Sequence, residues 1–348
     1  MAYTDIDKPS DYFNTVLYTG NGGTQSITGV GFQTDWSWIK RRDGSAFHVV
    51  TDSVRGATKQ IYPNDNQAEG TRAQGLQSFD SDGYTLGNEG DTNASSSTYV
   101  GWNWKAGTSF TNDASATGIG SMDSAGSVNE EAGFAIVSYT GNETASTLKH
   151  GLSTVPQMII VKGLISARDW IVGHHTQGWT KSAMLNETTA YSNQTHWNNT
   201  APTSSVFTIE GGSNSNVNTN NAGYIAYIFS ERKGYSKFSS YVGNGSSSGT
   251  YVHLGFKPAF IIQKNTSSAD AWVMFDNKRN GYNTAGNEKL YPNASTAEAD
   301  VSEIDFLSNG FKLRAGGNQN NNNGEVYIYM AFAEQPFVTS TGVPATAR

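Results

Sequence analysis

Tyr327-Ile328-Tyr329-Met330-Ala331-Phe332 closes the third of three similar segments of this chain. Its counterparts are Tyr99-Val100-Gly101-Trp102-Asn103-Trp104 and Tyr224-Ile225-Ala226-Tyr227-Ile228-Phe229. A run that is apolar at nearly every position, rather than at every second one, is typical of a strand buried on both faces. We therefore expect these three strands in the middle of a sheet or beneath a neighbouring domain.

The other landmarks of the three segments recur in the same order. A strand ending in lysine follows an aromatic turn in each copy, and the three turns read Tyr18-Thr19-Gly20-Asn21, Tyr139-Thr140-Gly141-Asn142 and Tyr241-Val242-Gly243-Asn244. Short runs rich in Val, Ile, Tyr, Phe and Trp, divided by Gly, Asn, Asp and Ser, are typical of antiparallel sandwiches. The sequence therefore predicts an all-β protein of three tandem antiparallel β-sandwich domains, jelly-roll or lectin-like, related by an internal repeat.

Domain boundaries follow from these landmarks and from a change in composition. Residues 108–132 are mainly small and polar with little to bury, which predicts a linker. The join between the second and third copies is too short for a linker, so we expect those two domains to pack directly. The predicted parts are repeat 1 (12–107), the linker (108–132), repeat 2 (133–233), repeat 3 (234–337) and a C-terminal tail (338–348).

Composition excludes several classes of protein. The 348 residues include no cysteine, so disulfides and thiolate chemistry are ruled out. A net charge of -7 without a basic stripe argues against nucleic-acid binding. No apolar run approaches the roughly 20 residues of a membrane span. Residues 1–7 are polar and do not resemble a secretory signal, so we expect assembly in a host cytoplasm.

Metal binding is one interpretation of two motifs. Asp80-Ser81-Asp82-Gly83 resembles the start of a calcium loop but lacks the remaining oxygen ligands. Its third-repeat counterpart, Asn309-Gly310, keeps the turn without the acids, so we favour hairpin turns in which both glycines adopt positive φ. Adjacent His174 and His175 point to opposite faces of a strand and rarely chelate one ion together. We expect no metal and no cofactor.

Catalytic motifs do not stand out. The sequence contains no obvious nucleophile elbow or phosphate loop. A glycosidase stays open because its two carboxylates can lie far apart in sequence, but Asp276 and Glu334 offer no clear pair. We therefore expect no enzyme activity and name no catalytic residue.

Aromatic residues near loops are the better candidates for binding. Flat rings stack against the apolar faces of sugars, and the loops of the three copies differ. The candidate glycan or receptor contacts are Trp36, Trp179, Tyr191 and Trp197. The alternative is that these four rings are ordinary core aromatics of a sandwich without cysteine.

Several stretches carry a resemblance to a known family. They are YFNTVLYTGN (12–21), APTSSV (201–206), GYSKF (234–238), GFKPAF (255–260), FDNKR (275–279), DFLSNGFKL (305–313) and MAFAEQPFV (330–338). Across essentially its whole length the chain resembles virion proteins of marine bacteriophages, those of cyanophages and pelagiphages, described only as a domain of unknown function. The resemblance implies a tail-associated structural protein of the virion and assigns no catalytic or binding residue.

We therefore expect the protein to act as part of the phage particle. The first interpretation is a tail-fibre or tail-tip component that mediates host attachment by non-catalytic binding of a surface glycan or protein receptor. The alternatives are a decoration or assembly protein of the tail or capsid, and a polysaccharide-degrading tailspike. Expected partners are other tail or capsid proteins and further copies of the chain, as a trimer or ring, but no nucleic acid.

Overall fold

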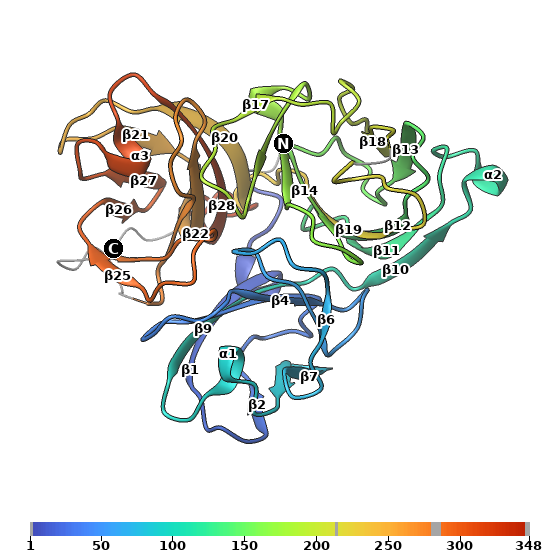
Figure 1. Ribbon diagram of the computed structural model, residues 1–348. Coiled ribbons are helices and arrows are strands. Elements are labelled where there is room, and N and C mark those ends of the chain that lie inside the picture. The colour runs from blue at the N-terminus through green and yellow to red at the C-terminus, as the bar shows by residue number, and fades with distance from the viewer. Residues whose placement is uncertain (1–2, 213–214, 280–286, 345–348) are drawn as a thin grey trace.

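Strands arranged as three lobes are the main regular structure of this chain. The computed structural model describes residues 3–212, 215–279 and 287–344. Figure 1 shows lobe 1 (13–104) in blue and cyan, lobe 2 (108–229) in green and yellow, and lobe 3 (236–336) in orange and red, placed around a common centre. The described helices are each a single turn: η1 (Pro9–Asp11), α1 (Gly90–Asn93), α2 (Ala114–Thr117), η2 (His175–Gln177) and α3 (Asn318–Asn321). The all-β prediction is confirmed.

Each lobe contains a main sheet with the same antiparallel strand order. The orders are β1-β9-β3-β4 in lobe 1, β12-β19-β14-β15 in lobe 2 and β20-β28-β22-β23 in lobe 3. The bounds are β1 (Phe13–Thr19), β3 (Trp36–Arg41), β4 (Val49–Asp52), β9 (Thr98–Trp104), β12 (Phe134–Thr140), β14 (Met158–Gly163), β15 (Ile171–His174), β19 (Gly223–Phe229), β20 (Ser236–Val242), β22 (Phe256–Asn265), β23 (Val273–Asp276) and β28 (Val326–Pro336). The closing strands β9, β19 and β28 thus lie inside their sheets, as expected.

A smaller sheet covers one face of each main sheet. Its strands are β2-β8-β7 in lobe 1, β13-β18 in lobe 2 and β21-β27-β26 in lobe 3, and each pair of sheets encloses an apolar core. The bounds are β2 (Gln25–Ile27), β7 (Leu76–Asp80), β8 (Gly83–Leu86), β13 (Ser146–Lys149), β18 (Val206–Ile209), β21 (Tyr251–His253), β26 (Ile304–Leu307) and β27 (Gly310–Leu313). Two hairpins complete lobes 1 and 3, namely β5 (Lys59–Gln60) with β6 (Gly70–Thr71) and β24 (Asn287–Lys289) with β25 (Ala299–Val301).

Residues 108–129 correct the linker prediction. They form a hairpin of β10 (Thr108–Asn112) and β11 (Ser124–Asn129), and β11 pairs with the edge strand β12. With β16 (Lys181–Met184) and β17 (Ser192–Asn193) at the other side, the sheet of lobe 2 has eight strands. Small polar residues suffice because an open sheet edge supplies backbone hydrogen-bond partners to any extended segment.

A fourth core lies where the three main sheets meet. Trp36 of lobe 1 contacts Phe229 of lobe 2 at a ring-centroid distance of 5.8 Å, and Phe229 lies 6.1 Å from Phe332 of lobe 3. Phe332 in turn stacks on Phe13 of lobe 1 at 5.2 Å. One face of each main sheet therefore packs in its own lobe and the other in the shared core, which explains strands that are apolar throughout.

The recurring lysine of each copy links one lobe to the next. Lys40, Lys162 and Lys264 are buried, and each ammonium donates hydrogen bonds to carbonyl oxygens of its own lobe and of another. The Nζ–O distances between lobes are 3.2 Å from Lys40 to Ser295, 3.1 Å from Lys162 to Asn66 and 3.1 Å from Lys264 to Thr188. The three bonds close a ring from lobe 1 to lobe 3, to lobe 2 and back. Burial lowers the pKa of each lysine to about 8.

Both hairpin glycines lie close against a neighbouring strand, and one of them also has a positive φ. Gly83 has a φ of +124°, and a Cβ there would lie 2.1 Å from the carbonyl oxygen of Ile27. Gly310 does not have the positive φ that we expected, but a Cβ there would lie 2.0 Å from the carbonyl oxygen of Val252. Close approach to the neighbouring strand therefore requires glycine at both positions.

Gly83→Val and Gly310→Val are each expected to lower the free energy of unfolding by about 3 kcal/mol. The added side chain would push β8 or β27 away from the strand that it pairs with. Urea titration followed by tryptophan fluorescence measures the change. Gly90→Ala is the control, because no atom lies within 4 Å of the added Cβ. Equal stability of all three variants would contradict the close-approach argument.

Candidate functional site

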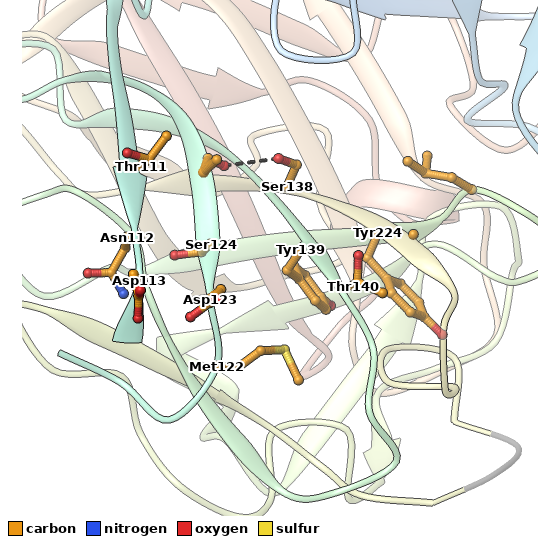
Figure 2. Close-up of a pocket in the computed structure, with 13 residues that line it drawn as sticks. Thr111, Asn112, Asp113, Met122, Asp123, Ser124, Ser138, Tyr139, Thr140 and Tyr224 are labelled. Carbon is orange, nitrogen blue, oxygen red and sulfur yellow. Dashed lines mark hydrogen bonds between the residues drawn. The ribbon is translucent and has the colours of Figure 1, made fainter. Parts of the chain in front are cut away.

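A groove with a volume of about 790 Å³ lies on lobe 2. Its wall on one side is the β10–β11 hairpin, and on the other it is formed by the ends of β12 and β19. Figure 2 shows Asp113 and Asp123 on the hairpin side, and Tyr139, Thr140 and Tyr224 across from them. A concave site with a few convergent polar groups is where a small ligand binds by default.

The hairpin side presents two exposed carboxylates. Asp113 accepts hydrogen bonds from the Ala116 N–H at 3.0 Å and the Ser115 hydroxyl at 2.7 Å, both through Oδ1. These bonds lower the pKa of Asp113, so it is ionised near neutrality. Asp123 accepts from the Ala114 N–H at 2.8 Å through Oδ1. Each carboxylate thus has one oxygen fixed by the backbone and further lone pairs to offer to a ligand.

The opposite side rests on two stacked tyrosines. The rings of Tyr139 and Tyr224 lie 5.1 Å apart at 11° to each other. The Tyr139 hydroxyl donates to the Val217 carbonyl at 2.8 Å, and the Tyr224 hydroxyl accepts from the Thr219 N–H at 2.8 Å. Both hydroxyls are thus used inside the lobe, and both rings are buried beneath the groove, where they hold the strand ends that carry the exposed Thr140.

Only part of this site recurs in the other lobes. Equivalent tyrosine pairs stack at 5.1 Å in lobe 1, between Tyr18 and Tyr99, and in lobe 3, between Tyr241 and Tyr327. Within the described ranges, neither β1 nor β20 has a hairpin like β10–β11 beside it. The carboxylate wall, and with it the groove, is therefore a feature of lobe 2.

The four aromatic residues named from the sequence lie in cores. Trp36 and Tyr191 belong to the shared core, while Trp179 and Trp197 contact each other edge-to-face at 5.5 Å in the core of lobe 2. All four side chains are buried, so none offers a ring face to a ligand from outside. The core interpretation therefore replaces the contact interpretation. Loops flank these four residues in sequence, but the four aromatic side chains point inward and fill space between sheets.

The acidic and histidine motifs have local partners. Asp82 accepts hydrogen bonds from the backbone N–H groups of Gly29 and Gly31 at 3.0 and 2.6 Å, which fixes the loop between β2 and β3. Asp80 accepts from the hydroxyls of two neighbours in the same hairpin. The His174 ring is buried, whereas His175 Nε2 lies 2.8 Å from the carbonyl oxygen of Phe238 in lobe 3. In residues 3–212, 215–279 and 287–344 no three potential ligands cluster as a metal would need.

Asp276 and Glu334, weighed as glycosidase acids, also have structural partners. Asp276 forms a buried ion pair with Arg279 at 2.6 Å and accepts from the Trp102 indole at 3.1 Å. Glu334 lies 3.1 Å from the Lys257 ammonium. Asp276 therefore serves the contact between lobes 3 and 1 rather than a solvent-accessible cleft.

Sequence reasoning missed the groove because its carboxylates lie in the segment interpreted as a linker. The available signal was weak: Phe110 and Val128 are the only large apolar side chains of the two hairpin strands, and they pack on the core of lobe 2. Asp113 and Asp123 are far from Tyr224 in sequence, and only strand pairing brings the three residues to the same groove.

Comparison with known proteins places the chain in a family. No helix in the part of the chain that the structure describes is long and apolar enough to cross a membrane. A search of the curated proteins finds no match. A family model described as Domain of unknown function (DUF7483) matches residues 8–336, a span that includes all three lobes and the hairpin. The chain therefore belongs to the DUF7483 family.

Proposed function

We propose that this protein is a non-enzymatic component of a bacteriophage particle, at the tail, and that lobe 2 holds a saccharide of the host surface. The resemblance to marine phage virion proteins supports the assignment to a phage particle. The groove supports the ligand, since two exposed carboxylates face the exposed Thr140 across a concave surface whose strand ends are held by the buried tyrosine pair. Sugar hydroxyls donate to carboxylates and exchange hydrogen bonds with hydroxyl groups such as that of Thr140.

The charge of the groove narrows the ligand class. Its lining includes Asp113 and Asp123 but no lysine, arginine or histidine. An acidic saccharide would meet like charge there, whereas hydroxyl or amino groups find acceptors. The ligand that fits is therefore a neutral or amino-bearing saccharide. Asp113, whose pKa is lowered, is unsuited to act as the general acid of a glycosidase, which favours binding over cleavage.

Weak binding at one groove is compatible with firm attachment of a particle. When many copies of a site are displayed together, the second contact becomes intramolecular, and avidity exceeds the affinity of one site by about 10²–10⁴. We therefore expect a single chain to bind its saccharide weakly, and an array of copies to adhere.

A role in particle assembly is the second candidate, and the sheet edges favour it. In lobe 2, β11 pairs with β12, so β12 is not at the edge of its sheet. The equivalent strands β1 and β20 are at the edges of their sheets in the described structure. Leu17 on β1 and Val242 on β20 are exposed. Edge strands with exposed apolar side chains pair readily with another chain. Labelling of the protein within the virion separates the two candidates: a capsid or internal tail position supports assembly.

Thr140→Arg is expected to weaken binding to host cells. Thr140 is exposed on the groove, and an arginine there would extend into it and compete with the ligand for the facing carboxylates. Fluorescently labelled protein is titrated onto host cells and isolated envelope, with a loss of at least about tenfold expected, or roughly 1.4 kcal/mol.

Thr19→Arg is the matched control. Thr19 occupies the same place in the aromatic turn of lobe 1 and is exposed, but no hairpin faces it. Equal binding of both variants and the unchanged protein would contradict the proposal. Release of oligosaccharide from the envelope would instead show a tailspike enzyme.

A further inference from the structure

A second groove, with a volume of about 300 Å³, lies on lobe 3. Three parts of the chain form it: residues before β1, the region around β20 and β21, and residues after β28. The side chains that matter for ligand binding are Tyr3, Lys233, Lys237, His253 and Phe337. Its volume is at the lower end of the range of small-molecule pockets, about 300–1,000 Å³.

Two aromatic rings of this groove are open to solvent. Tyr3 is 61% exposed and Phe337 is 38% exposed, unlike the buried tryptophans of the cores. The segment that carries Tyr3 is fixed, because the Asp5 N–H donates to the Lys233 carbonyl at 3.0 Å and the Lys233 N–H donates to the Asp5 carboxylate at 3.0 Å. Phe337 is held by its N–H, which donates to the Gly255 carbonyl at 3.2 Å.

Close packing also keeps the Tyr3 segment in place. Gly234 has a φ of +78°, and a Cβ there would lie 2.1 Å from the Thr4 hydroxyl. That hydroxyl donates to the Lys233 carbonyl at 2.7 Å. Both rings are therefore presented on anchored backbone, so no backbone segment has to be ordered when a ligand stacks on them.

Cationic side chains line the same groove. Lys237 Nζ donates to the His253 carbonyl at 2.9 Å, which holds the ammonium at the groove with two further N–H donors. Lys233 is a second lysine in the lining, and Glu231, the one acid there, lies near the Phe238 N–H at 3.4 Å. On a chain with a net charge of -7, this groove is locally basic. Its charge is opposite to that of the groove on lobe 2.

We propose that the groove on lobe 3 binds an acidic saccharide. The sugar ring would stack on Tyr3 and Phe337, and its carboxylate or sulfate group would accept hydrogen bonds from Lys237, assisted by the charge of Lys233. A saccharide is favoured over a peptide because open rings stack on sugar faces and side-chain cations pair with an acid group, and the lining offers both. The inference does not require any ligand on lobe 2. If both grooves are occupied, one chain contacts two kinds of sugar, and the two contacts reinforce each other.

The test uses the full chain and two probes of equal length. Tetragalacturonate is the acidic probe and an uncharged galactose tetrasaccharide is the neutral one, with binding measured by calorimetry or NMR titration. We expect the acidic probe to bind at least fivefold more tightly, and its affinity to fall with salt. Tyr3→Ala and Phe337→Ala should each weaken binding about tenfold, and Lys237→Gln should remove the preference for the acidic probe.

Tyr251→Ala is the matched control, because Tyr251 is 45% exposed on β21 but does not line the groove. It should bind the acidic probe as the unchanged protein does. Absence of binding, equal binding of both probes, or an unaltered affinity of Tyr3→Ala would overturn the inference. Binding of an acidic peptide in place of the saccharide would overturn it as well. Thr140→Arg is run in parallel: it tests only lobe 2, so failure of one site is distinguished from failure of the other.

Discussion

Acidification from pH 7 to pH 5 is expected to lower the free energy of unfolding by about 5 kcal/mol, through three buried histidines that must stay neutral. His48 Nδ1 accepts from the Trp38 indole at 2.8 Å, His150 Nδ1 accepts from the Leu152 N–H at 3.1 Å, and His174 Nδ1 accepts from the Thr176 N–H at 3.3 Å. A proton on any of these nitrogens would remove the acceptor. All three rings are fully buried.

The sign follows from the pKa values in the two states. Burial lowers the pKa of His174 to about 3 and that of His150 to about 4, and it lowers the pKa of His48 well below its ordinary value. In the unfolded chain each histidine titrates near 6.5. As the pH falls through 6.5, the histidines of the unfolded state become protonated while those of the native state stay neutral. Their contribution to the free energy of unfolding is therefore present above pH 6.5 and is lost progressively below it. Each histidine contributes about 1.8 kcal/mol of that loss.

Urea titrations between pH 7.5 and 5 measure this slope. His174→Gln should reduce the loss between pH 7 and pH 5 by about 1.8 kcal/mol, and His253→Gln, at an exposed position of β21, is the control for the substitution itself. Asp35 acts in the opposite sense, because burial raises its pKa, so its protonation offsets part of the loss on acidification. A stability that is constant from pH 7 to pH 5 would refute the assignment of neutral buried histidines.

Asp276→Ala is expected to destabilise the protein by about 3–5 kcal/mol, the cost of leaving a buried charge without its partner. The side chains of Asp276 and Arg279 have no solvent exposure, and the carboxylate also accepts from the Trp102 indole of lobe 1. Removing it leaves the Arg279 guanidinium with a longer contact of 3.4 Å to Glu298 and leaves the indole N–H without its acceptor. The loss should therefore loosen the contact between lobes 3 and 1.

Asp305→Ala is the control for this prediction. Asp305 pairs with Arg314 at 3.2 Å in the same lobe, but the Arg314 side chain is 48% exposed, so its loss should cost less than about 1 kcal/mol. Melting temperature and urea midpoint are measured for both variants. Similar small losses would show that the buried pair contributes no more than a surface pair.

Much of the fold could be predicted because its signals are local. Hydrophobic periodicity and turn residues predicted the strands, and the threefold recurrence of aromatic turn, lysine-ended strand and closing strand matches three sheets of identical strand order. The aromatic turns are alike for a physical reason. Asn93, Asn218 and Asn321 each accept, through a side-chain oxygen, from the N–H of the turn asparagine in their lobe.

The candidate sites could not be predicted in the same way. Residues 108–129 carry too few apolar side chains to signal strands, and they are ordered by the open edge of β12. Conversely, large aromatic side chains near loops are easy to recognise in the sequence, but the same rings can fill a core or form a binding surface. This ambiguity applies to Trp36, Trp179, Tyr191 and Trp197. Exposure separates the two, and exposure depends on what packs against a side chain.

Strand periodicity and turn chemistry act over a few neighbouring residues, so the sequence alone predicted an all-β chain with three similar segments and with central strands that are apolar on both sides. Three features became visible only in the folded protein. The second faces of the three sheets meet in one core, the lysines link the lobes in a ring, and two grooves of opposite charge lie on lobes 2 and 3. Each of these features joins residues far apart along the chain. Their contact is fixed by the packing of whole sheets, and no short stretch of sequence encodes it.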